Sequence, residues 1–478
     1  MSSKQQKLRT NQLTPNANKS FSIGTKLMVD GWYQKLGLEA VIGPLKSKGI
    51  AADALVRGML AYKLGENFSV LQASEWLNRP EILESYELEE FDPKTLYRMV
   101  ELVGKNRNKI IYALQDRVLQ LLGCSKTDVL LDWTSLVYYG HMAKLAKFGY
   151  SRDHQPGERQ ITLGVALLAP PYNVPFGMTV EPGNVNDQVH MRATYGQVRP
   201  FLREGSLVVF DRGANDKKNL ERIELDGNDY LSAKRLNSSD EKILAGFSED
   251  AWECVDADDG VYALKRTFPS RVNYYFFSKK LKKDHLKSCR RKAERLLAEA
   301  KAIQASLDKG RKLPKRFRIN NPLVDVKYDY QTKLVEMEEA DALRLLLDQV
   351  IDGDEGCFCL TSSRDMPALE ALTVYRSKDA VEKLFHSLKS EIEVKPVRVW
   401  SEDAVYGVLL IGFIAQLMIC LTRHFVKPAR TVSTKFIIAS LQKLTLTLVF
   451  DGDGRKKRFY SNFDPLNSAI LAEYLAET

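Results

Sequence analysis

The sequence predicts an α/β fold whose centre is a mixed β-sheet flanked by helices. Two observations predict it. Three strand patterns follow one another with turn residues between them, and helix and strand patterns then alternate. Strands that meander and then alternate with helices are typical of a sheet with both antiparallel and parallel neighbours. The chain has 478 residues, of which 44% are hydrophobic. This length suggests about two to four structural units, each with its own core.

The predicted sheet has five strands in chain order. Turn residues separate the first three strands, and a helix is expected before and after the fourth. The strand patterns are VLLDWTSLVYY (129–139), QITLGVALLAPPY (160–172), VPFGMTVEPG (174–183), SLVVFD (206–211) and DYLSAKRL (229–236), with helices at 187–202 and 215–225.

The chain before the sheet is predicted to be a helical domain at 24–122, preceded by a disordered basic tail at 1–23. Apolar residues recur at helical spacing in 68–77 and in 93–103. These two helices fit either a helix-turn-helix or part of a plain bundle.

The second of these helices has a clear start. Asp92 can cap it, and Pro93 suits its first position. Lys94 and Arg98 would therefore lie near its exposed beginning.

The sheet domain is expected in two parts, 123–236 and 356–425, separated by an inserted β-rich and helical subdomain at 237–355. The insertion contains a long charged helix at 279–307. A helical region at 426–478 follows. Basic clusters in the insertion fit either a solvated surface or phosphate contacts.

One segment, Val405–Leu421, is apolar enough to be considered for a membrane span, but its length is at the short end. Ser401 and the two acids after it suit a helix N-terminus. We therefore expect a core helix and no membrane association. The N-terminus lacks an apolar signal core, and the six cysteines form no CxxC pair, so a reducing, cytoplasmic location is expected.

The net charge of +9 and the pI of about 9.0 favour acidic partners such as nucleic acid. Phosphate-loop, HExxH and GxSxG motifs are absent from the sequence. This weighs against several other enzyme classes.

Two aspartates follow apolar strand patterns where a strand-interior Asp needs a reason. They are Asp132 in VLLDW and Asp211 in VVFDRG. Carboxylates at the ends of strands are typical ligands of Mg²⁺, which prefers oxygen. Taken singly, each Asp also fits a turn or a helix cap. Asp128, Asp153 and Asp187 are competing acids near the same strands.

The third acid lies in YRSKDAVEKLFHSLK (375–389). Wound as one α-helix, this segment places Glu382 on a polar line with Tyr375, Lys378 and Lys389, opposite an apolar face. A lone carboxylate among cations suits a metal ion beside phosphate. An ordinary amphipathic surface helix is the alternative.

The order Asp132, Asp211, Glu382 resembles the DDE transposases of bacterial insertion sequences. Their YREK signature spaces Tyr, Arg, Glu and Lys as Tyr375, Lys378, Glu382 and Lys389 are spaced here, with Lys in place of Arg. A lysine keeps the charge but loses the bidentate fork. Further segments resemble the same family: GYSRDHQPGERQITLGVAL, PFGMTVEPGNVND, FDRGAND and DYLSAKRL.

The resemblance implies an RNase H-like core in which Asp132, Asp211 and Glu382 are catalytic and bind two Mg²⁺ ions, with Mn²⁺ as a substitute. It also implies that Tyr375, Lys378 and Lys389 contact DNA.

Further expectations concern partners. Arg212, beside Asp211, fits either a DNA contact or a structural ion pair. Lys94 and Arg98 would contact transposon ends from the helical domain at 24–122. The expected partners are double-stranded DNA and a second copy of the chain in a homodimer formed through 426–478. The bacterial nucleoid is the expected location of the DNA-bound protein.

Three alternatives remain open: an RNase H-like nuclease without strand transfer, a non-catalytic DNA-binding protein, and a helical scaffold for acidic proteins. The last predicts no effect from replacing Asp132, Asp211 or Glu382.

Overall fold

The computed structural model describes residues 18–65, 69–140, 142–310, 321–326, 332–334, 338–394, 397–450 and 456–475. The chain divides into two compact units. Unit 1 contains the residues up to Asp229 and from Arg376 onward, and unit 2 runs from Tyr230 to Tyr375. The sequence predicted an insertion at 237–355. Unit 2 is longer at both ends.

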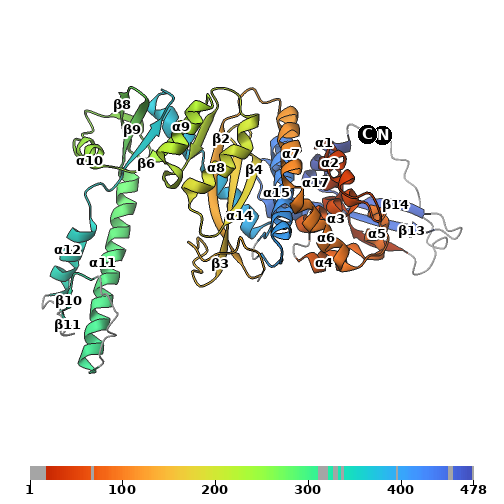
Figure 1. The fold of residues 1–478 in the computed structure, drawn as a ribbon, viewed down its shortest axis with the longest axis horizontal. Helices are drawn as coiled ribbons and strands as arrows, with labels where there is room; N and C mark the ends of the chain where they lie inside the picture. Colours follow the sequence, from red (N-terminus) through yellow and green to blue (C-terminus); the bar gives the residue numbers. More distant parts are fainter. Residues whose placement is uncertain are drawn as a thin grey trace. The chain divides into compact units, whose positions relative to one another are not determined.

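The strands of unit 1 have the order β4–β3–β2–β5. Figure 1 labels β2, β3 and β4 among the helices that surround them. The pairs β2–β3 and β3–β4 are antiparallel, and β2–β5 is parallel. The predicted α/β class with a mixed sheet is confirmed, and the strand order is consistent with an RNase H-like core. The strands are β2 (Val129–Tyr138), β3 (Arg159–Leu168), β4 (Val174–Pro182) and β5 (Leu207–Phe210).

Helices cover this sheet because its strands are apolar on both faces. The helix α8 (Asp187–Val198) packs on β2, β3 and β4, and α14 (Asp379–Ser390) packs on β2. The indole N–H of Trp133 in β2 donates to Thr194 Oγ1 of α8 at 3.0 Å. Since successive strand residues point to opposite faces, Asp132 faces away from α8.

The predicted helix at 187–202 ends earlier, at Val198, and a 3₁₀ turn, η3 (Arg199–Phe201), completes it. The 3₁₀ turn η4 (Arg212–Ala214) follows β5, and α9 (Lys217–Leu225) follows η4.

The helix α15 (Glu402–Phe425) is the core helix that the sequence predicted. Among the described residues it is the one helix that is long and apolar enough to cross a membrane. Of its apolar 18-residue stretch, 83% is buried within the protein. The Ser401 side chain caps it by accepting from Ala404 N at 3.2 Å. The helix packs on β4 and on helices of the N-terminal part of the chain.

The N-terminal part is helical, as predicted. Its helices are α1 (Gly24–Lys35), α2 (Leu38–Ile42), η2 (Gly43–Leu45), α3 (Ala52–Gly65), α4 (Val70–Leu77), α5 (Pro80–Tyr86), α6 (Pro93–Lys105) and α7 (Arg107–Leu122). The Asp92 carboxylate caps α6 by accepting from Lys94 N at 2.8 Å. The two helices considered as a helix-turn-helix, α4 and α6, have α5 between them in the chain.

The two chain ends of unit 1 differ from the prediction. Residues 18–23 do not belong to a tail: β1 (Lys19–Ser22) pairs with β13 (Thr445–Phe450), and Ile23 is buried beside Leu444. Residues 1–17 lie outside the described residues. The C-terminal region is not only helical, because β13 pairs with β14 (Lys456–Ser461). Its helices are η5 (Lys427–Ala429), α16 (Thr434–Lys443) and α17 (Pro465–Leu475).

Unit 2 has an antiparallel sheet of order β6–β12–β9–β8–β7. The predicted fifth strand of the core is present as β6, which follows β5 in the strand order, and the unit boundary falls after its first residue, Asp229. The strands are β6 (Asp229–Lys234), β7 (Glu253–Asp256), β8 (Val261–Phe268), β9 (Arg271–Ser278) and β12 (Cys357–Ser362), with α10 (Ser238–Ala245) and α13 (Ala368–Arg376).

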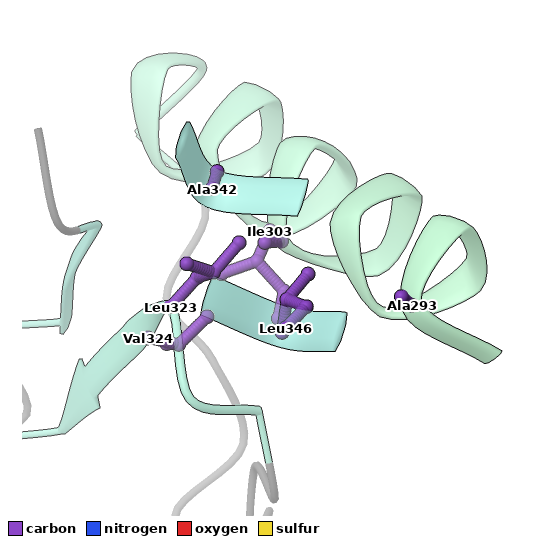
Figure 2. Close-up of a cluster of buried hydrophobic side chains, with 7 residues drawn as sticks. Ala293, Ile303, Leu323, Val324, Ala342 and Leu346 are labelled. Carbon is purple, nitrogen blue, oxygen red and sulfur yellow. The ribbon is translucent and has the colours of Figure 1, made fainter. Parts of the chain in front are cut away.

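The predicted long helix is α11 (Lys279–Asp308), which packs against α12 (Glu339–Val350). Figure 2 shows the small apolar cluster that joins them, with Ala293 and Ile303 on α11, and Ala342 and Leu346 on α12. The short strands β10 (Val324–Val326) and β11 (Thr332–Leu334) pair nearby, and Val324 enters the cluster.

Candidate functional site

The two predicted strand aspartates lie next to each other. The parallel register pairs Val129 with Val208 and Leu130 with Val209, an offset of 79 (208 − 129). The same offset places Asp132 beside Asp211, on the same face of the sheet. Asp132 is not at the end of its strand, as the sequence suggested, because β2 continues to Tyr138. It lies instead where the neighbouring strand β5 ends.

The carboxyl group of Asp132 has an unusual electrostatic environment. Burial raises its pKa to about 6. Lys378 and Arg152 oppose this shift, and the negative charge of Asp211 adds to it. Asp132 Oδ1 accepts a hydrogen bond from the backbone N–H of Trp133 at 2.8 Å. Two carboxylates in this arrangement favour a bound cation, because each raises the energy of the other's charge.

Lys378 supplies a cation at this position. Its side chain is buried, and its ammonium group forms an ion pair with Asp211 Oδ1. Lys378 precedes the first residue of α14, so its position depends on where that helix begins.

The prediction of one continuous helix over 375–389 is wrong. The helix α13 ends at Arg376 and α14 begins at Asp379. At the break, Val381 N donates to Lys378 O at 2.8 Å, an i→i−3 bond that is tighter than α-helical geometry. Tyr375 therefore belongs to α13, as the last residue of unit 2.

The apolar face predicted for this segment is confirmed within α14. Its buried members are Val381, Leu384, Phe385 and Leu388, and Ile392 just beyond the helix is also buried.

The polar face of α14 carries Glu382 and Lys389. Glu382 is exposed in the first turn. Within the described residues, no three Asp, Glu, His or Cys side chains are grouped so as to hold a metal ion. The structure thus brings Asp132 and Asp211 together without joining Glu382 to them. Lys389 Nζ forms a salt bridge with Asp153 Oδ1 at 3.2 Å, with both side chains 13% exposed.

Arg152 is a residue that the sequence reasoning missed. It donates from Nη2 to both oxygens of Asp187, at 3.1 and 2.9 Å, and its backbone N–H donates to Ser135 Oγ at 2.7 Å. Its charge helps to lower the pKa of Asp132. This arginine is in the motif YSRDH, and its partner Asp187 follows 35 residues later, so no local pattern joins the two.

The remaining predicted DNA-contacting residues lie at the surface. Arg212 is exposed in η4, directly after Asp211. Lys94 and Arg98 are exposed in the first turns of α6.

The residues present fit a hard divalent cation. The two neighbouring carboxylates provide oxygen ligands, and the Lys378 ammonium on Asp211 shows that the pair attracts positive charge. Mg²⁺ commonly binds through one or two carboxylates, with water and substrate phosphate completing its coordination. Chemistry at phosphorus is the reaction class that such a site supports.

Comparison with known families agrees with this chemistry. The sequence model of one family, described as "Transposase DDE domain", matches residues 123–418, which is more than half of the chain. The chain belongs to this family. It is a DDE transposase, an enzyme of DNA cleavage and strand transfer.

Among solved structures, the chain is similar to one described as "Cryo-EM structure of piggyBac transposase synaptic complex with hairpin DNA (SNHP)". The sequence identity is 10% and the TM-score 0.42, and the match covers 90% of this chain and 81% of the other. A search of curated proteins found no match.

Proposed function

We propose that Asp132, Asp211 and Glu382 are the catalytic residues of this transposase. The observation that carries the proposal is the nearness of Asp132 and Asp211. The parallel register of β2 and β5 runs toward both residues, the charge of Asp211 raises the pKa of Asp132, and the Lys378 ammonium pairs with Asp211. Glu382 is assigned by its spacing in the YREK pattern. It also lies one helical turn after Lys378, whose ammonium reaches Asp211. All three acids lie within the matched region 123–418.

The cofactor in this proposal is Mg²⁺, two ions per site, with Mn²⁺ as a substitute. Asp132 and Asp211 would hold the metal, with Glu382 as the third carboxylate. Bound divalent ions supply charge stabilisation to the attacking and leaving oxygens of an in-line displacement.

The reaction consists of two displacements at phosphorus. In the first, water attacks the phosphodiester at the element's end, and the bond to the 3′ oxygen breaks to leave a 3′-OH. In the second, that hydroxyl attacks a target phosphodiester, forming one P–O bond while another breaks. The acid pair and Lys378 provide the charged environment in which the phosphate is oriented.

The cations around the acids would bind the DNA backbone. Lys378 and Lys389 are held by Asp211 and Asp153 in the absence of DNA, and would exchange these carboxylates for phosphates. Tyr375 is assigned to the same role by its place in the YREK pattern. Arg212, Lys94 and Arg98 are exposed and would make further backbone contacts.

The same proposal places the chain in the YREK class of bacterial insertion-sequence transposases. It gives double-stranded DNA ends to the helical domain as its binding partner. It also includes a homodimer that holds two DNA ends. Sedimentation of the protein with and without a DNA end tests the dimer.

The experiment that tests the function uses purified protein, Mg²⁺ and the DNA flanking its own gene. Cleavage at the element's ends and joining to a plasmid are scored for wild type and Glu382→Gln. Metal-dependent cutting and joining, lost in Glu382→Gln with DNA binding retained, is expected. Glu221→Gln is the matched control, because Glu221 is an exposed acid on α9 that pairs with its helix neighbour Lys217.

Other outcomes separate the alternatives. Cutting without joining favours a nuclease. A Glu382→Gln protein as active as wild type would remove Glu382 from the site.

A further inference from the structure

A large cavity lies in unit 1 beside α14. Its volume is about 1040 Å³, at the upper end of what ligand sites usually offer. The turn between β3 and β4, the polar side of α14, the end of α15 and residues 430–434 line it.

The cavity extends around α14 from the side that carries Glu382. Lys383, Ser387 and Glu391 line it at about 100° or more from Glu382, whereas Asp379 and His386 line it at about 60° and 40°. The cavity therefore adjoins the helix face of Glu382, while Glu382 itself, Asp132 and Asp211 are not among the residues that line it.

The lining carries an excess of positive charge. Its formal charges are the cations Arg376, Lys383, Arg423 and Arg430 and the acids Asp379 and Glu391, four against two. Lys383 pairs with Asp379 at 2.5 Å, but both side chains are well exposed. Such surface pairs are weak and exchange easily for a better anion.

One wall is buried and rich in hydrogen-bonding groups. Ser387 Oγ lies 2.9 Å from Gln416 Oε1 and 3.1 Å from Thr434 Oγ1, and all three side chains are buried. Arg423 is held against this wall by donating to Thr434 Oγ1 at 2.9 Å and to Val432 O. A cation fixed in this way loses little entropy when an anion binds.

The opposite part of the lining offers an aromatic surface. The rings of Tyr172 and His424 lie 5.9 Å apart, and both side chains are partly exposed. Burial and the nearby Arg430 hold the pKa of His424 below its ordinary value, so its imidazole is neutral at neutral pH. Neutral rings beside a basic groove are the combination with which proteins bind single-stranded nucleic acid.

We propose that this cavity is a binding site for a single-stranded segment of DNA, with its phosphates near Arg423, Arg430 and Lys383 and one base stacked on Tyr172 and His424. An unpaired base exposes the face that stacking requires, whereas the bases of a duplex stack on one another. The proposal rests on the proposed function, since it gives a second place on the enzyme to the DNA that is cut. A strand held here would contact the same helix that carries Glu382.

Photocrosslinking locates the site directly. The full-length protein is irradiated with a single strand of about twelve nucleotides containing 5-iododeoxyuridine, and adducts are mapped by mass spectrometry. Adducts on peptides containing Tyr172 or His424 are expected. The Tyr172→Ala variant should lose them while keeping its thermal unfolding midpoint. Adducts confined to other surfaces of the protein would overturn the proposal.

The charge contribution is measured with a matched pair of variants. Arg430 lines the cavity, whereas Lys427 is also exposed three residues earlier and is not among the lining residues. For Arg430→Ala, the slope of log affinity against log salt for the same single strand should become shallower by about 0.7. Lys427→Ala should leave the slope unchanged. An equal change of the slope in both variants would show that the strand is attracted by the general positive charge of the surface and does not bind in the cavity.

The binding assay also separates this proposal from the proposed function. It needs neither metal nor cleavage, so Glu382→Gln should bind the strand as wild type does. A wild-type protein that cleaves the element's ends but gives no adduct on Tyr172 or His424 would refute the cavity alone. A Glu382→Gln protein that still cleaves, with the adducts unchanged, would refute the catalytic assignment alone. A duplex of the same sequence, tested in parallel, should give no adduct on Tyr172 or His424.

Discussion

At the residue scale, Asp132 is the carboxyl group whose charged form is disfavoured by burial beside a second acid. Its pKa rises from 3.8 to about 6, mainly through burial. Between these values the folded protein binds this proton and the unfolded chain does not. The free energy of unfolding therefore falls as pH rises through the window from about 4 to about 6. Above about pH 6, the charged Asp132 carboxylate lowers the free energy of unfolding, and a bound cation would restore it.

Replacing Asp132 by Asn should remove this cost. With a chelator present, the unfolding free energy of Asp132→Asn near pH 7.5 should exceed that of wild type by up to about 3 kcal/mol, from about two pKa units. The two proteins should converge near pH 4. The amide oxygen can still accept the Trp133 N–H. Urea unfolding at several pH values measures the difference, and parallel pH profiles would contradict the predicted cause.

Lys378 is the second residue-scale case. Its ammonium pairs with Asp211 and lowers the pKa of Asp132. Lys378→Met should therefore raise the pKa of Asp132 further and reduce DNA cleavage by about 10- to 100-fold, as expected when a charged hydrogen bond worth about 1.5–3 kcal/mol is lost. Lys378→Arg, which restores the usual YREK residue, should retain most of the activity. Cleavage rates of the two variants, measured against Mg²⁺ concentration, test this difference. Equal rates for Lys378→Met and Lys378→Arg would argue against an effect of charge.

At the element scale, α6 and α15 cross so closely that glycine is needed. A Cβ on Gly104 would lie 1.7 Å from Asp403 O, and a Cβ on Gly407 would lie 2.0 Å from Val100 O. No side-chain movement relieves a clash with backbone, so the helices would have to separate.

Gly104→Ala should therefore destabilise unit 1 by about 2–3 kcal/mol. Gly196→Ala in α8 is the control, because a Cβ there meets no atom within 4 Å. It should stabilise by about 0.5–1 kcal/mol. Thermal unfolding of both variants tests the contrast, and a neutral Gly104→Ala would mean that the crossing is looser than described.

At the scale of the whole molecule, the apolar interior is not one continuous core. The pair α11 and α12 has its own small cluster, which includes Leu346 at 0% exposure. Unit 1 has its own buried sheet, with Leu130 of β2 also at 0% exposure. Local unfolding should follow this division.

Leu346→Ala should cost about 2–5 kcal/mol, confined to the α11–α12 pair. Hydrogen exchange should show faster exchange in α12 and unchanged protection in β2 and β3. Leu130→Ala should do the reverse. Loss of protection across both units in either variant would show that they unfold together.

The sequence by itself determined the strands of the core, most helices and the family to which the chain belongs. Apolar runs separated by turn residues identify β2, β3 and β4, because these patterns depend on local burial and backbone geometry. Asp92 predicts the start of α6 because capping is local. Asp132 and Asp211 could be named because an acid after an apolar run is rare enough to need a function.

Only the tertiary structure decided how these parts meet. The parallel register places Asp132 beside Asp211, although 79 positions separate them in the chain. The break between α13 and α14 directs Lys378 to Asp211, and no local signal in YRSKDAV shows it. The pairing of β1 with β13, the cavity beside α14 and the role of Arg152 all depend on contacts between distant segments. Local propensity cannot encode such contacts, because their energy exists only once the chain has folded.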